Sequence, residues 1–463
     1  MPMFAHVLLD INWSSVWLQA GQLILSLSIL VILHELGHFI PAKIFGCRVE
    51  KFYLFFDPWF SLVKKKVGDT IYGIGWLPLG GYVKIAGMVD ESMDKEQLKK
   101  PAESWEFRSK PAWQRLIIMI GGVTVNVLLA FFIYAMILFK WGETKLPMSS
   151  LQNGVWIVDT VVNEIGLKNG DRIISVNDEK VQYFDNINAS LMLGDHMDII
   201  RDGQPMKLAI PVNFIEKILE KGKRSILLMP RVPCIVGEVG KGTAAEKNGL
   251  LANDKIVGID SFKIDYFDQV KSLITTKAGD SVNLHVIRNG QPLTLHSVIN
   301  ADTSIGFFPA VPTLSEMKDQ GLYDFETRNF SFLASFPAGV NKAGEKLSNY
   351  VSQFKKILNP STGAYKGLGG FKSMGSIFPK YEWDWEAFWN ITAFFSIVLA
   401  FMNLLPIPAL DGGHVLFTLY EMVTGRKPNE KFLEYAQIVG MVLLFGLMIY
   451  ANANDWLGWG RGR

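Results

Sequence analysis

Four long apolar segments constrain the fold of this chain more than any other feature of its sequence. They cover residues 16–40, 113–138, 388–405 and 432–450, and the first is expected to end where a proline follows it. Each is long and apolar enough to cross the hydrocarbon core of a bilayer as a helix. The mean hydropathy of +0.20 over 463 residues agrees with this interpretation. We therefore predict an integral membrane α-helical bundle with four spans in the lipid bilayer.

The distribution of Lys and Arg orients the predicted spans. Residues 1–40 contain neither, whereas residues 41–112 contain twelve and the loop before the fourth span carries three more. The positive-inside rule places these two basic loops in the cytoplasm. Both termini and residues 139–386 are then expected outside the cytoplasmic membrane. The net charge of +2 gives no indication of nucleic-acid binding.

The first apolar segment contains the pattern H-E-x-x-H, formed by His34, Glu35 and His38. Residues four apart lie on one face of a helix, so both imidazoles can bind the same metal ion. Glu35 then lies close enough to act on a water molecule at that ion. Two histidines and a carboxylate are costly in hydrocarbon unless they have such a role. The motif predicts a zinc site with Glu35 as the catalytic residue.

A second polar motif, at the end of the third span, is predicted to complete the site. Residues 403–414 contain two prolines, which break a helix, and two glycines, which permit a tight turn. A catalytic zinc ion needs a third protein ligand beside the two histidines. A buried aspartate in a broken helix, in turn, needs a cation. We predict Asp411 as the third ligand; the alternative is that it caps the helix that follows.

The second span has a face of small and amide residues, formed by Gly121, Gly122 and Asn126. Small residues let two membrane helices approach closely, and an amide can form a hydrogen bond across their interface. We expect this face to pack against another span.

The loop between the first two spans contains a predicted β-element at residues 71–88. Two short β-type runs flank residues 78–81, which favours a hairpin or a small sheet. The element is unusually apolar for a cytoplasmic loop. It either lies on the membrane surface, or dips towards the metal site and offers a free edge to a substrate strand. The periodicity favours neither interpretation.

An internal repeat occupies much of the segment between the second and third spans. Residues 166–177 match residues 249–260, and the match continues in register. The pattern G-L-x-x-G-D-x-I resembles PDZ domains of the bacterial, protease-associated type, with Asn253 replacing the glycine before the aspartate in the second unit. We expect PDZ-like α+β domains at residues 141–220 and 221–310. Such domains either bind peptide ends at a sheet edge or act only as a steric gate.

The remaining domain boundaries follow from these features. Residues 1–140 would carry the first two spans, the metal motif and the β-loop, and residues 385–463 the last two spans with the third ligand. Residues 311–384 would form a juxtamembrane region. Apolar residues recur there at helical spacing between positions 347 and 358, which predicts an amphipathic helix.

The motifs together resemble the site-2 protease family of intramembrane zinc metalloproteases. The features that carry the resemblance are H-E-x-x-H in the first span, N-x-x-P-x-P-x-L-D-G-G after the third, and PDZ-like units between spans two and three. The resemblance covers essentially the whole chain and is closest to the bacterial regulator-of-sigma-E branch. It implies zinc ligands at His34, His38 and Asp411, a catalytic glutamate at Glu35, and a substrate-contacting asparagine at Asn403.

The resemblance also bears on the β-loop and on the substrate. Residues 71–88 are similar to the family's membrane-re-entrant β-loop, which implicates Tyr82, Val83, Lys84 and Ile85 in substrate binding by strand addition. The implied activity is endopeptidase cleavage of transmembrane segments in single-pass membrane proteins, after a first cut outside the membrane. The implied substrates are anti-sigma factors and remnant signal peptides.

Two other functions compete with this interpretation. A membrane zinc protease of the prenyl-protein type would use a glutamate as its third ligand and would lack the PDZ tandem. A catalytically silent membrane receptor would use its PDZ-like units to bind exposed peptide ends, and the intact Glu35 argues against it.

Overall fold

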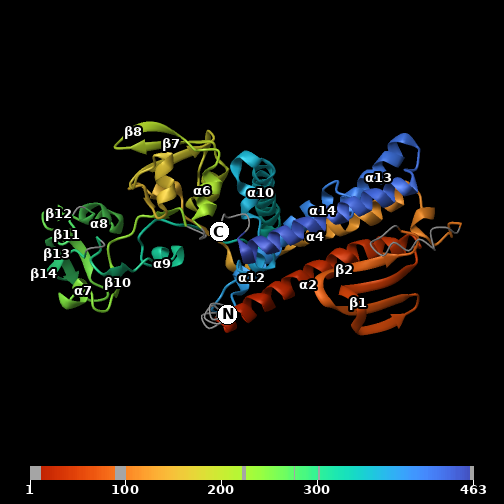
Figure 1. The fold of residues 1–463 in the computed structure, drawn as a ribbon, viewed down its shortest axis with the longest axis horizontal. Helices are drawn as coiled ribbons and strands as arrows, with labels where there is room; N and C mark the ends of the chain where they lie inside the picture. The colour runs from red at the N-terminus through yellow and green to blue at the C-terminus, as the bar shows by residue number, and fades with distance from the viewer. Residues whose placement is uncertain (1–11, 89–100, 222–225, 276, 301–302, 459–463) are drawn as a thin grey trace. The chain divides into compact units, whose positions relative to one another are not determined.

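The computed structural model describes residues 12–88, 101–221, 226–275, 277–300 and 303–458 (Figure 1). Both chain termini, for which the charge distribution predicts the outer side, lie outside the described residues. The chain divides into two compact units. Unit 1 consists of Met1–Glu143, Asn329–Leu358 and Tyr365–Arg463, and unit 2 of Thr144–Arg328 and Asn359–Ala364.

Four helices of unit 1 are long and apolar enough to cross a membrane. They are α2 (Trp13–Ile44), α4 (Ala112–Trp141), α12 (Trp385–Leu404) and α14 (Glu430–Leu457). In the described part of the chain, each of the four predicted segments is therefore a helix of membrane-spanning length. Three of these helices begin with a side-chain cap. Asn12 accepts a hydrogen bond from the Ser15 N–H, Asp384 accepts one from the Ala387 N–H, and Asn429 accepts one from the Lys431 N–H.

The first span is predicted to end at Pro41. Instead, the helix continues through this proline to Ile44. A proline inside a helix removes one backbone donor, and the turn that follows can still form. Here the Phe45 N–H donates to the Pro41 carbonyl at 2.9 Å, and the Cys47 N–H donates to the Ala42 carbonyl at 2.8 Å. These bonds close the helix beyond the proline, which the sequence rule did not anticipate.

Helix α4 is the centre of unit 1. It packs against α2, α12, α10 (Phe332–Leu358) and α13 (Asp411–Thr424). Its approach to α2 is backbone against backbone, because a Cβ atom on Gly121 would lie only 2.0 Å from the carbonyl oxygen of Gly37. Only glycine permits so close an approach. The predicted packing role of the glycine face is confirmed.

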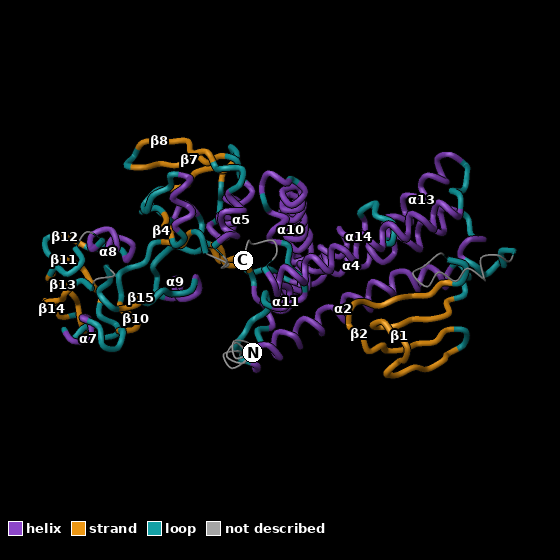
Figure 2. Tube along the Cα trace, in the orientation of Figure 1, coloured by secondary structure: helices purple, strands orange, loops and turns teal. Residues whose placement is uncertain are grey.

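Residues 49–85 form an antiparallel sheet of two long, bent strands, β1 (Val49–Val67) and β2 (Thr70–Ile85) (Figure 2). The predicted β-type runs on either side of residues 78–81 exist, but they do not pair with each other. They pair with opposite sides of the first half of β1, so that Tyr53 is opposite Tyr82 on one side and Gly73 on the other. The small sheet is confirmed, and the hairpin is wrong because β1 lies between the two runs.

The predicted amphipathic helix in the juxtamembrane region is present as α10, and it starts well before the periodic segment. Its apolar face packs on α4 and α12. Tyr350 lies edge-on against both Phe394 and Phe401 of α12, with ring centroids 6.0 and 5.5 Å apart. The helix therefore belongs to the core of the membrane-helix unit.

Unit 2 contains two modules of short strands and helices. The first has β4 (Val155–Ile157), β5 (Arg172–Val176), β6 (Glu179–Lys180), α5 (Ile187–Leu193), β7 (His196–Arg201), β8 (Gln204–Ala209), α6 (Phe214–Glu220) and β9 (Leu228–Pro230). The second has β10 (Val236–Val239), α7 (Ala244–Lys247), β11 (Lys255–Ile259), β12 (Phe262–Lys263), α8 (Phe267–Ile274), β13 (Ser281–Arg288), β14 (Gln291–Val298) and β15 (Phe307–Pro309). The remaining strands and α-helices of the described chain are β3 (Glu143–Lys145), α9 (Leu314–Asp319), β16 (Glu326–Arg328) and α11 (Phe371–Gly375).

The two modules have the same strand order, which confirms the internal repeat. Four strands pair as β6-β5-β7-β8 in the first module and as β12-β11-β13-β14 in the second. In each module the first and last strands form a separate two-stranded ladder, β4-β9 or β10-β15. Each module encloses a hydrophobic core of its own.

A buried ion pair holds the repeated turn in both modules. Arg201 contacts Asp171 at 2.6 Å, and Arg288 contacts Asp254 at 2.7 Å. The same guanidinium groups also donate to the carbonyl of the glycine that opens the repeated Gly-Leu turn. Asn253, which replaces the expected glycine, has a φ of +69°. Asparagine tolerates this left-handed conformation, so the turn survives the substitution.

The repeat extends further towards the N-terminus than the sequence comparison indicated. The Phe184 N–H donates to the Leu146 carbonyl at 2.8 Å in the first module. The Phe267 N–H donates to the Val232 carbonyl at 2.9 Å in the second. In each module, the segment that enters the module is therefore hydrogen-bonded to the equivalent phenylalanine, Phe184 or Phe267.

Candidate metal centre

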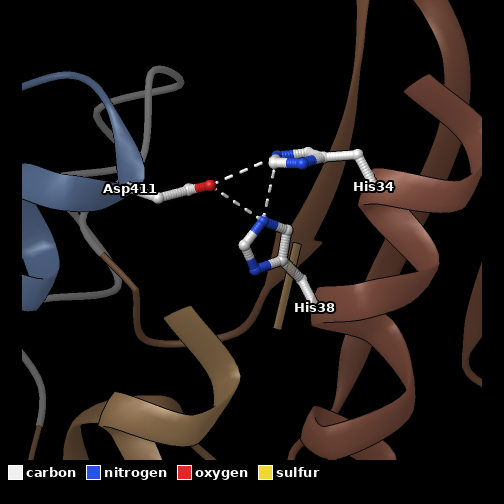
Figure 3. A group of neighbouring side chains, drawn as sticks. All are labelled: His34, His38 and Asp411. Carbon is white, nitrogen blue, oxygen red and sulfur yellow. Dashed lines mark hydrogen bonds and ion pairs between the residues drawn. The ribbon is translucent and has the colours of Figure 1, made fainter. Parts of the chain in front are cut away.

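Three side chains from two distant segments converge on one point (Figure 3). His34 and His38 project from α2 one turn apart, and Asp411 is the first residue of α13. The two Nε2 atoms lie 3.3 Å apart, and the Oδ2 atom of Asp411 lies 3.2 Å from each of them. No second cluster of this kind occurs among the described residues. The structure thus brings together all three predicted ligands.

The broken segment after the third span places the carboxylate. Helix α12 ends at Leu404, and the chain then turns so tightly that a Cβ atom on Gly412 would lie 2.2 Å from the Leu405 carbonyl oxygen. The N-cap of α13 is Leu410, which makes no side-chain capping bond. The Oδ2 atom of Asp411 faces the histidines instead. This geometry favours the role of Asp411 as a metal ligand over its alternative role as the cap of the helix that follows.

The three atoms have the spacing of ligands to one divalent cation. Atoms at about 2.0–2.1 Å from a tetrahedral zinc ion are about 3.3–3.4 Å apart, and here the separations are 3.2–3.3 Å. Apart from the two Nε2 atoms, the buried Oδ2 atom of Asp411 has no hydrogen-bond partner within the described structure, and a buried carboxylate is costly unless a cation meets it. Two imidazoles and one carboxylate leave one tetrahedral position open, as in catalytic zinc sites. The residues fit a zinc ion.

Helix α4 orients both imidazole rings. The Nδ1 atom of His38 lies 2.8 Å from the carbonyl oxygen of Ile118, to which it can donate a proton and so leave Nε2 for a metal. The Nδ1 atom of His34 lies 3.0 Å from the amide nitrogen of Asn126. Gly122 leaves room for both rings, because a Cβ atom there would lie 2.4 Å from His38 Nε2 and 2.6 Å from His34 Cε1.

Sequence reasoning assigned Gly122 and Asn126 to helix packing and missed that they contact the ligand rings. A signal was present. The two residues are four apart on α4, as His34 and His38 are on α2, so two helices packed face to face bring the pairs into register. The Ile118 carbonyl carries no sequence signal, because every residue has one.

Glu35 lies between the ligand cluster and the edge of the sheet. Its carboxyl group interacts electrostatically with both histidines and with Asp411. The Val83 backbone forms a hydrogen bond with the same carboxyl group. A Cβ atom on Gly81 would lie 3.6 Å from the Glu35 Cγ atom. A carboxylate in this place can exchange protons with a water molecule near the ligands.

The amide of Asn403 also reaches the site. Its Nδ2 atom lies 3.3 Å from His34 Nε2, on the side of the ring that faces the other ligands. An amide N–H there can donate to an oxygen on which negative charge develops.

The residues predicted to bind substrate at the β-loop form one edge of the sheet. Residues 81–85 pair with β1 along one side. The Tyr82 hydroxyl donates to Asp57 at 2.8 Å, Lys84 forms an ion pair within the sheet, and Ile85 is buried. What this edge can offer to an extended peptide is therefore its backbone.

Known proteins that are similar to this chain are named as proteases. The family model described as peptidase family M50 matches residues 22–447. A Campylobacter jejuni protein whose name designates it a candidate zinc metalloprotease is 30% identical over 93% of this chain and 91% of its own length. The regulator of sigma E protease of Haemophilus influenzae is 26% identical over 94% of this chain and 98% of its own. The regulator of sigma-E protease RseP of Escherichia coli is 27% identical over 94% and 97%.

Proposed function

This chain belongs to peptidase family M50, and from that premise we propose that it cleaves transmembrane segments of single-pass membrane proteins inside the membrane. Membership makes it a zinc-dependent metalloprotease, and its four apolar helices make it a membrane protein. The residues proposed for the chemistry are His34, His38 and Asp411 as zinc ligands and Glu35 as the catalytic residue. Asn403 is proposed to contact the substrate.

The observation that carries this proposal is the convergence of two imidazoles from the apolar helix α2 and one carboxylate from the start of α13. Their metal-binding atoms lie 3.2–3.3 Å apart. Polar groups are expensive inside a membrane and are retained there for function. A purely structural site would use all four tetrahedral positions, whereas this one leaves a position for water and has Glu35 next to it.

The chain's own residues perform the proton transfers and orient the reacting groups. When bound, zinc would supply a Lewis acid that polarises a carbonyl and lowers the pKa of water to about 7. Glu35 accepts a proton from the attacking water and passes it to the nitrogen of the leaving amine. The Asn403 amide donates a hydrogen bond to the carbonyl oxygen as negative charge develops on it. One rigid helix holds Glu35 and both histidines, which fixes their relative geometry.

A transmembrane substrate must unwind before its backbone can be attacked, because every peptide group of a helix is bonded internally. Pairing the unwound segment with the sheet edge at residues 82–85 would replace the lost hydrogen bonds. The bond between Glu35 and the Val83 backbone supports this route, since it sets the edge directly beside the proton acceptor. On this proposal residues 71–88 are a membrane-re-entrant β-loop.

Unit 2 is proposed to select substrates. The repeated strand order supports a tandem of PDZ-like domains, with boundaries near residues 141–220 and 221–310. The charge distribution supports a periplasmic position for them in a bacterial inner membrane. There they would exclude proteins that keep bulky outer domains, so that cleavage follows a first external cut. Two similar proteins are named regulators of sigma E, which supports anti-sigma factors as substrates beside remnant signal peptides.

The test uses the purified full chain in lipid nanodiscs with a single-span test substrate, measuring bound zinc and cleavage on the same sample. Glu35→Gln keeps the shape of the side chain and removes its basicity. We expect one zinc per chain and a loss of cleavage of about 10²- to 10⁴-fold. Glu382→Gln, at an exposed glutamate of the same unit, is the matched control and should keep both.

Full cleavage by zinc-loaded Glu35→Gln would remove Glu35 from the mechanism. A wild-type chain that binds zinc and captures peptide ends but cuts no membrane substrate would favour the silent receptor.

A further inference from the structure

The two ligand histidines are held by chemically different partners. Behind His38 stands the backbone carbonyl of Ile118, which can only accept a hydrogen bond. Behind His34 stands the side-chain amide of Asn126, at 3.0 Å, which offers a donor at one end and an acceptor at the other. Asn126 has no exposed surface. The difference matters because every residue supplies a backbone carbonyl, whereas a buried side-chain amide is present only where the sequence places an Asn or Gln.

Metal binding dictates which end of that amide must face the ring. A histidine that gives the Nε2 lone pair to a metal carries its proton on Nδ1, and this proton needs an acceptor. In the structure the amide nitrogen of Asn126 faces Nδ1, and its Oδ1 atom is buried with no hydrogen-bond partner among the residues described. A half-turn of the amide exchanges the two atoms. It converts the unpaired oxygen into the acceptor that the metal-binding tautomer of His34 requires.

We propose that Asn126 is a positioning residue of the metal site: its amide selects the His34 tautomer that presents Nε2 to zinc and holds the ring at the angle the other ligands require. This inference rests on the proposed assignment of His34 as a zinc ligand. An amide suits the role because it can serve the ring in both states. It donates to Nδ1 when the metal is absent and accepts from Nδ1–H when the metal is bound.

The third span fixes the helix segment that carries this amide. The Ser396 hydroxyl of α12 donates to the backbone carbonyl of Asn126 at 2.7 Å. One turn away, the Thr392 hydroxyl donates to the hydroxyl of Ser26 on α2 at 2.9 Å. All four residues are fully buried. These bonds hold α2, α4 and α12 in one register and leave the Asn126 side chain with one described partner, the His34 ring.

This placement separates a positioning role from ordinary interhelical packing. An amide that only joins two helices forms its hydrogen bond with the backbone of the other helix or with a side chain that has no further role. The Asn126 amide pairs instead with a ring whose opposite nitrogen lies 3.2 Å from Asp411. Partners of this kind typically contribute about 10- to 100-fold to metal affinity.

The experiment measures zinc affinity of the full-length chain in nanodiscs by competition with a chromogenic chelator. Asn126→Leu keeps the volume and apolar packing and removes the acceptor. Asn126→Asp keeps an oxygen that can accept from Nδ1–H. We expect the Leu variant to lose about 10- to 100-fold in zinc affinity, which is the usual effect of losing one such partner of a ligand histidine. The Asp variant should stay within about 3-fold of the wild type, because it keeps an acceptor for the Nδ1–H group. The absorption spectrum of the cobalt-substituted protein should change in Leu and be restored in Asp.

Thr124→Val is the matched control, because Thr124 is an exposed residue of the same helix, two positions from Asn126, and its hydroxyl donates to the Ile120 carbonyl of that helix. It should leave zinc affinity and the cobalt spectrum unchanged. If the Leu variant fails to give a monodisperse metal-free protein, Asn126→Ala, which only removes atoms, takes its place.

Wild-type zinc affinity in the Leu or Ala variant overturns the inference, as does an equal loss in the Leu and Asp variants. His34→Ala separates this inference from the proposed function. If His34→Ala keeps zinc, the ligand assignment itself fails. If it loses zinc while Asn126→Leu keeps it, only the positioning role fails.

Discussion

Adding one methyl group at Gly122 should weaken the metal site without touching a ligand. A Cβ atom there would lie 2.4 Å from His38 Nε2, 2.6 Å from His34 Cε1 and 2.9 Å from His34 Nδ1. Atoms in ordinary contact are about 3.5–4.0 Å apart, so either the rings or the helix must move. The rings are held from behind by Ile118 and Asn126, and a shift takes their Nε2 atoms away from the common point.

The size of the effect follows from the cost of overpacking. Inserting a methyl group into a well-packed interior costs about 1–3 kcal/mol. If the metal-bound arrangement alone bears this cost, zinc affinity falls by roughly 5- to 150-fold. Helix propensity acts in the opposite direction on folding, because Gly→Ala inside a helix stabilises the helix by about 1 kcal/mol. A stable variant with weak zinc binding would therefore be diagnostic of the clash.

The assay is zinc affinity by chelator competition on the purified Gly122→Ala chain, with thermal unfolding of the metal-free protein as a parallel readout. Gly21→Ala is the matched control, since it lies on the ligand helix α2 and has nothing within 4 Å of its added Cβ. The control should bind zinc like the wild type. Wild-type zinc affinity in Gly122→Ala would show that the two rings do not pack against Gly122.

Two further predictions concern the sheet edge and the second module. Val83→Pro removes the backbone donor beside Glu35 and should reduce cleavage of a single-span substrate while bound zinc stays constant; an equal loss in Val63→Pro, on the opposite edge of the sheet, would mean that proline only disrupts the fold. Burial raises the pKa of Asp254, but hydrogen bonds from Arg288 and the Leu251 backbone outweigh it and hold that pKa below its ordinary value. A lowered folded-state pKa stabilises the module at pH values above the unfolded pKa of about 4, and this contribution is lost as pH falls through the folded pKa. Acid unfolding of the full chain followed at this module should become less steep in Asp254→Asn, and an unchanged profile would count against the ion pair.

The local parts of the site were predictable from the sequence, and the reasons are physical. His34 and His38 share a face because a helix has 3.6 residues per turn, a property that depends on no distant residue. Asp411 could be named because the chemistry of a zinc site requires a third ligand and the broken motif after the third span supplied one. The repeated turns were visible because both modules use the same Arg–Asp pair to hold them.

What the sequence could not show depends on which distant segments meet. The two β-type runs around residues 78–81 pair with opposite sides of residues 49–54 rather than with each other, and local periodicity carries no information on strand order. The continuation of α2 through Pro41 depends on bonds from the turn that follows. The contacts of Gly122 and Asn126 with the ligand rings exist only because α2 and α4 pack backbone to backbone.

The most direct test of the central claim is the zinc coordination shell of the purified wild-type chain, measured by X-ray absorption at the zinc edge together with metal content. The account predicts one zinc per chain with two imidazole nitrogens and one or two oxygens at about 2.0–2.1 Å, and loss of the ion in Asp411→Ala. A shell that lacks the imidazole pair, or a full complement of zinc in Asp411→Ala, would contradict it.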